Sequence, residues 1–115
     1  MEKGFEYLRK FQPVAAQIVA SYDFSMPVNS DSMSPYINRG DIIACSKVNI
    51  DDLKPGHIYV VDMDEAAYIN RVYEVPGDDG KLSLVSDNAK YPDYCINKSD
   101  VYNVYRVIGM IRVVV

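Results

Sequence analysis

The sequence predicts a single domain of mostly β structure, arranged as a barrel-like sheet. From Phe24 onward, short β-branched runs alternate with clusters of Asp, Asn, Gly and Pro, at intervals of roughly ten residues, as is typical of antiparallel sheets and barrels. The chain has 115 residues, of which 49% are hydrophobic. This size and composition suit one globular domain that folds without a metal ion or disulfides.

The N-terminal segment, residues 1–22, has a different pattern. Between residues 5 and 22 the apolar side chains recur mostly every three or four residues, which predicts a short amphipathic helix. Pro13 either kinks this helix or marks its first turn. The apolar positions are Leu8, Phe11, Ala15, Ile18, Val19 and Tyr22.

The remaining residues, 23–115, read as strands separated by turns. Gly and Pro mark tight turns at 38–41 and 54–56, and the run 76–80 predicts a hairpin loop, because these residues favour turn conformations. The predicted strands are 24–28, 42–48, 57–63, 66–75, 81–86 and 104–114.

The last of these strands is almost entirely apolar, from Val104 to Val115. At the edge of a sheet such a strand would promote aggregation unless it paired with another chain. A homodimer in which two copies pair these strands would solve the problem. Burial within the sheet of one subunit is the alternative, and the sequence does not decide between them.

Charge and composition narrow the function. The net charge of −4 has the wrong sign for a domain that binds nucleic acid. No apolar run approaches the ~20 residues that a membrane helix needs, so we expect a soluble, cytoplasmic protein. Cys45 and Cys95 lack the spacing of metal ligands and His57 is the only histidine, so we expect no metal or other cofactor. We expect the two cysteines to be reduced and mostly buried.

The stretch Val28–Pro35, of sequence VNSDSMSP, contains the candidate for catalysis. A nucleophilic serine must project from a rigid turn, with backbone N–H groups directed at the developing oxyanion. Ser32 fits the nucleophile, with the amides of Asp31 and Ser32 as oxyanion donors. The alternative is that the serines of this stretch only cap a short helical turn near Pro35.

These features, in this order, resemble the C-terminal domains of LexA-like repressors and UmuD-like proteins, which are Ser/Lys peptidases of the S24 family. The resemblance runs from about Asp23 to Arg112. It implies a LexA-like or signal-peptidase-like β fold with Ser32 as nucleophile. The matching elements are the serine stretch, Gly40-Asp41, Pro55 to Val61, Tyr68 to Val72, Ser86-Asp87-Asn88 with Tyr91-Pro92, and Val107 to Arg112.

The sequence departs from the family at one position. The general-base lysine aligns with Asn70, whose amide forms hydrogen bonds but cannot accept a proton. Arg71 stays protonated and should point to the opposite face of its strand. His57 could act as base only if it lay near Ser32. We therefore expect hydrolysis to be slow or absent.

The resemblance also implies biological partners. LexA-like proteins are homodimeric transcriptional regulators that cleave their own linker, with a RecA-like filament as co-protease in some of them. They bind DNA through a separate helix-turn-helix domain, which residues 1–22 are too short to form. They cut at a small-residue dipeptide, often Ala-Gly or Cys-Gly, and neither Ala-Gly nor Cys-Gly occurs in residues 1–31.

Two other functions remain open. A signal-peptidase-like enzyme would share Ser32-Met33-x-Pro35 and the Pro-Gly-Asp at 76–78, but the chain shows no apolar anchor of the length that membrane insertion requires. A purely non-catalytic oligomerisation module is the second possibility, which Asn70 favours.

Overall fold

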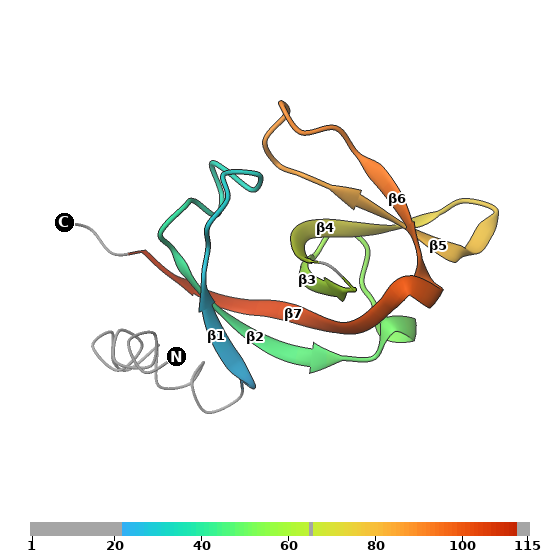
Figure 1. Ribbon diagram of the computed structural model, residues 1–115, viewed down its shortest axis with the longest axis horizontal. Helices are drawn as coiled ribbons and strands as arrows, with labels where there is room; N and C mark the ends of the chain where they lie inside the picture. Colours follow the sequence, from blue (N-terminus) through green and yellow to red (C-terminus); the bar gives the residue numbers. More distant parts are fainter. Residues whose placement is uncertain (1–21, 65, 113–115) are drawn as a thin grey trace.

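The computed structural model describes residues 22–64 and 66–112. Seven strands form one antiparallel sheet in the order β1-β2-β7-β3-β4-β5-β6, and the sheet curls into a half-barrel (Figure 1). This confirms the predicted mostly-β fold. The predicted N-terminal helix lies outside the described residues, apart from Tyr22 at its end.

The strands follow the predicted β-branched runs closely, with one addition. The structure adds β6, a short and largely exposed edge strand that the sequence pattern does not reveal. Two 3₁₀ turns, η1 (Ile50–Asp52) and η2 (Lys98–Asp100), precede β3 and β7. The strands are β1 Phe24–Pro27, β2 Ile42–Val48, β3 Ile58–Met63, β4 Ala67–Val75, β5 Asp78–Val85, β6 Tyr94–Asn97 and β7 Val101–Ile111.

The hairpin between β4 and β5 is tighter than the predicted loop over 76–80. Val75 pairs with Asp78, so only Pro76 and Gly77 form the connection. Proline fixes φ at the first position of such a turn, and Gly77 adopts the positive φ of +78° that the second position requires. The prediction of a five-residue loop was wrong because this Pro-Gly pair is a sufficient turn by itself.

Strand β7 lies inside the sheet rather than at its edge. It pairs with β2 from Val104 to Ile111 and with β3 from Val101 to Arg106. The sequence left open whether this apolar run pairs with another chain or is buried within one subunit, and residues 104–106 have paired neighbours on both sides. Beyond Arg106, β3 no longer pairs with β7, and the stretch 107–111 has a paired neighbour on the β2 side only.

The loop after β1 is anchored by its own apolar residues. Met33 and Ile37 are each 1% exposed and belong to a core cluster with Ile43 of β2 and Val60 of β3. Burial of each such side chain contributes roughly 1.5–3 kcal/mol. The loop that carries Ser32 is therefore fixed to the body of the sheet immediately after the serine.

An ion pair between buried Asp41 and half-exposed Arg112 fixes the other end of this loop. Asp41 is 2% exposed and accepts hydrogen bonds from Nε and Nη2 of Arg112, at 3.0 and 2.9 Å, and from the Asn38 N–H at 2.7 Å. The Arg112 guanidinium lowers the pKa of this carboxyl. The Gly-Asp turn is thereby tied to the end of β7.

Candidate active site

Ser32 and Asn70 line the same cleft, which has a volume of about 510 Å³. Ser32 comes from the loop after β1, and Asn70 comes from β4. The rest of the lining is mostly apolar and aromatic, and includes Met26, Met33, Tyr68, Ile69, Tyr91 and Tyr94. The fold thus brings the predicted nucleophile and the predicted base position to one site.

Asn70 is almost completely enclosed. It lies opposite Tyr59 of β3, is 3% exposed, and its Nδ2 donates a hydrogen bond to Ser86 Oγ at 2.9 Å. A buried amide is stable there because it has this partner. No proton can be taken up at this position, because an amide has no basic atom at accessible pH.

The backbone amide of Ser32 has an acceptor within its own loop. It donates to Ser30 Oγ at 3.1 Å, as short hydroxyl side chains often accept from the N–H two residues on. This amide could serve an oxyanion only after giving up that bond. The Asp31 N–H, the other expected donor, interacts with the carboxylate of its own residue.

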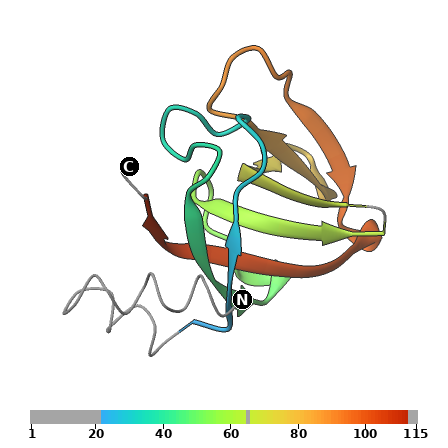
Figure 2. The same cartoon turned by 60° about the vertical axis from the view of Figure 1, so that its left-hand side comes forward.

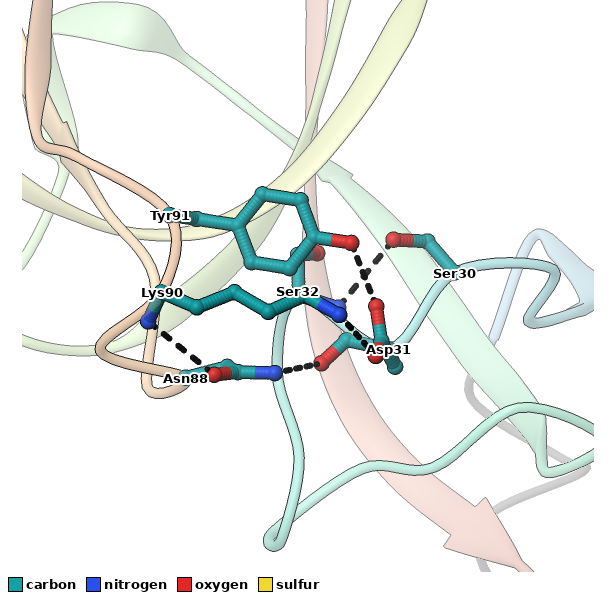
Figure 3. A network of polar contacts seen from close by, with 6 residues as sticks. All are labelled: Ser30, Asp31, Ser32, Asn88, Lys90 and Tyr91. Atoms are coloured by element: carbon teal, nitrogen blue, oxygen red, sulfur yellow. Dashed lines mark hydrogen bonds and ion pairs between the residues drawn. The ribbon is translucent and has the colours of Figure 1, made fainter.

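The segment 86–91 after β5 holds this loop from the opposite side (Figure 3). The Asn88 N–H donates to Ser32 O at 3.0 Å, and Asn88 Nδ2 donates to Asp31 O at 3.1 Å. The Asp31 carboxylate accepts from the Tyr91 hydroxyl and pairs with Lys90 Nζ at 3.1 Å. The hydrogen bond from Tyr91, with Lys90 adding to it, lowers the pKa of Asp31.

The next residue along β4, Arg71, points into a different cleft, as its alternation along the strand predicts. Its guanidinium pairs with Asp87 through Nε–Oδ1 at 2.7 Å and Nη2–Oδ2 at 3.1 Å. Its Nη1 donates to Gly56 O at 2.8 Å, and its Cζ lies 5.4 Å from the centre of the Tyr36 ring. Arg71 is therefore engaged in structural contacts.

His57 lies with Arg71 in that second cleft, which has a volume of about 310 Å³. Its Nδ1 is 3.1 Å from Nη2 of Arg106. Ser32 is absent from the residues that line this cleft. The structure therefore gives no support to His57 as the base for Ser32.

The described part of the chain holds no group of three or more His, Cys, Asp or Glu side chains suited to a metal ion. Cys45 is buried, and burial raises the pKa of its thiol to about 12. Cys95 is exposed, so the expectation of a buried thiol was wrong there, because β6 is an edge strand. No helix in the described residues has the length and apolar character needed to span a membrane.

Sequence reasoning identified Ser32 and Asn70 but did not identify Lys90 and Tyr91 as contacts of Asp31. These contacts join residues 59 and 60 positions apart in the chain, which no local pattern reveals. The Ser86-Asp87-Asn88 motif, with Tyr91-Pro92 after it, was the one signal that pointed to this segment.

Ser32 lies on an anchored loop beside a mostly apolar cleft in a curled antiparallel sheet, an arrangement compatible with a serine nucleophile. Among models of known protein families, the one described as Peptidase S24-like matches residues 3–111 of the chain. The chain therefore belongs to the Peptidase S24-like family. No curated protein matches it.

Proposed function

We propose that this chain is the peptidase-like and dimerisation domain of a LexA-type or phage-repressor-type transcriptional regulator, with self-cleavage impaired or absent. The observation that carries this proposal is the shared cleft of Ser32 and Asn70. Ser32 supplies the hydroxyl that the nucleophile position requires, whereas Asn70 does not supply the amine that the base position requires.

The chemical argument concerns the serine proton. A serine hydroxyl becomes a useful nucleophile when a neighbouring base accepts its proton. In a Ser/Lys site that base is a lysine whose pKa is lowered by burial, so that it is neutral near physiological pH. Asn70 is buried as such a lysine would be, but its side chain carries an amide instead of an amine. Loss of the base leaves only the acceleration that the oxyanion site and substrate binding supply.

The proposal assigns DNA recognition to a separate domain, since the net charge of this chain is −4. It assigns homodimerisation to the stretch 107–111 of β7, because that stretch has a paired neighbour on one side only. Strands with an open side pair readily with a second copy of themselves. We place the regulator in the cytoplasm, with a RecA-like filament as its candidate co-protease.

A fluorophosphonate probe tests the defect at Asn70. In the Asn70→Lys variant we expect Ser32 Oγ to bond to phosphorus as fluoride leaves, with the serine proton passing to the introduced amine. Labelling should require Ser32 and should rise toward alkaline pH as the amine loses its proton. The chain with Asn70 should label at least about 100-fold more slowly, which is the usual scale of general-base catalysis.

Matched variants separate the base from other effects. Ser32→Ala in the Asn70→Lys background should abolish labelling, and Asn70→Met should fill the position without supplying an amine. Thermal unfolding of each variant shows whether it folds. Equal labelling of the wild-type chain and Asn70→Lys would contradict the claim that Asn70 is the defect. A folded but inert Asn70→Lys would favour a purely non-catalytic oligomerisation module.

A further inference from the structure

The segment 86–91 contacts both sides of the cleft. Ser86 accepts from Asn70 on β4, and Asn88 donates to the backbone carbonyls of Asp31 and Ser32. In Figure 2 this orange segment and the teal loop after β1 stand at the same end of the half-barrel. Because the segment bonds to both β4 and the serine loop, it links the position of the loop to that of β4.

Asn88 makes an unusual pair of contacts with the serine loop. Its backbone N–H reaches the carbonyl of Ser32, and its side-chain amide reaches the carbonyl of Asp31, which also accepts from the Ser34 N–H at 3.1 Å. A trans peptide unit is planar, so fixing a carbonyl also fixes the N–H that follows it. Asn88 thus sets the orientation of the two peptide planes on either side of the Ser32 Cα atom.

The same side chain also orders its own segment. Asn88 Oδ1 accepts from the Lys90 N–H at 3.1 Å, which places Lys90 and Tyr91 to reach the Asp31 carboxylate. The Lys90 side chain is 65% exposed, so solvent screens its ion pair and that contact alone stabilises the loop little. The Asn88 amide to Asp31 O is a contact between partly buried groups.

We propose that Asn88 is a positioning residue for Ser32: it fixes the peptide planes around the serine and thereby the direction in which the hydroxyl enters the cleft. This inference rests on the proposed function, because it concerns the same serine. Small displacements of a nucleophile reduce the rate of attack strongly, since productive geometry requires close alignment. Loss of Asn88 should therefore lower the rate of attack more than the affinity for a probe.

The first experiment uses hydrogen exchange on the chain with Asn70 in place, so it does not depend on restored catalysis. Asn88→Ala should raise amide exchange in peptides covering residues 29–36 by at least about tenfold, and exchange in β2 should not change. Asn97→Ala is the matched control, because among the described residues the Asn97 side chain bonds only to exposed Asp100, at 3.4 Å. Unchanged exchange in 29–36 would overturn the proposal.

The second experiment measures fluorophosphonate labelling in the Asn70→Lys background, with the maximal rate and the half-saturating probe concentration determined separately. Asn88→Ala and Asn88→Asp should each lower the maximal rate about 10–100-fold and change the half-saturating concentration less than threefold. Asn88→Asp is informative because it keeps the acceptor for Lys90 but cannot donate to Asp31 O. Asn97→Ala should label at the parental rate.

The outcomes distinguish the two proposals. If Asn70→Lys is folded but inert, the account of the missing base fails, and the exchange experiment alone decides the role of Asn88. If Asn70→Lys labels and the Asn88 variants label at the same maximal rate, the positioning role is wrong even where exchange rises. Unfolding midpoints of the Asn88 variants close to the parental value exclude a general loss of structure.

Discussion

The side-chain amide of Asn70 donates a hydrogen bond to Ser86 Oγ over 2.9 Å, joining β4 to the segment that follows β5. Asn70 is 3% exposed, so water cannot easily replace this partner. The contact shows how a polar residue without a charge is accommodated at the position that the resemblance predicts for the general base.

Ser86→Ala should destabilise the fold by about 1–3 kcal/mol, because it leaves a buried amide without an acceptor. Urea unfolding monitored by circular dichroism measures this change. Ser99→Ala, at an exposed position in η2, should change the free energy of unfolding by less than about 0.5 kcal/mol. Equal effects of the two substitutions would mean that the Asn70–Ser86 bond contributes nothing.

The ion pair between buried Asp41 and Arg112 predicts a specific acid sensitivity. The pKa of Asp41 is lowered in the folded state, so the unfolded state takes up the proton first as the pH falls. The stability from this carboxylate is thus fully present above its unfolded pKa of about 3.9. It is lost as the pH falls through the lower, folded-state value.

Asp41→Asn should therefore cost about 1–3 kcal/mol at pH 7 and progressively less as the pH is lowered below 4. Urea unfolding of variant and wild type across this range provides the measurement. Asp79→Asn, at an exposed position in β5, is the control. A difference between Asp41→Asn and wild type that does not shrink in acid would show that the ionised carboxylate is not responsible.

The two thiols should differ in reactivity. Cys95 is exposed, whereas Cys45 is buried and its pKa is raised to about 12, so little reactive thiolate forms there. Ellman's reagent should therefore modify Cys95 alone in the native protein, and both thiols in denaturant. Cys95→Ser should abolish the native reaction. Rapid modification of Cys45 in native Cys95→Ser would contradict the placement of Cys45 in the core.

The stretch 107–111 of β7, which pairs with β2 but not with β3, predicts how dimerisation can be disrupted. Light scattering at micromolar concentration should report a dimer for the wild-type chain and a monomer for Ile108→Lys, because the introduced charge would lie at the pairing surface. Tyr102→Lys is the matched control, since Tyr102 is exposed on β7 but lies in the part that β3 covers. A monomeric wild-type chain would argue against the proposed interface.

The sequence predicted most of the sheet because its strands are β-branched runs bounded by Gly and Pro. It missed β6, whose four residues, Tyr94–Asn97, are too short and too exposed to show an alternating pattern. It left the neighbours of β7 undecided, since an apolar run looks the same whether its neighbours come from the same chain or from another. Strand order depends on long-range pairing, which local composition does not encode.

The sequence predicted the two main residues of the candidate site but not the contacts that hold them, because those contacts are also long-range. Ser32 and Asn70 follow from motif order, and the structure places both at one cleft. The bond from the Ser32 amide to Ser30 Oγ and the contacts of Asp31 with Lys90 and Tyr91 did not follow. They depend on how two loops meet in space, and polar loop residues give no periodic signal by which to foresee such a meeting.

The place of β7 in the sheet has a consequence for how the protein is made. β7 is the last of the seven strands along the chain, yet it alone joins the pair β1-β2 to the group β3-β4-β5-β6. Translation proceeds at roughly 5–20 residues per second, so the two parts are synthesised before the strand that unites them. The seven-stranded sheet can form only after β7 leaves the ribosome, and a nascent chain arrested before Val101 would carry two pieces of sheet that no strand pairing connects.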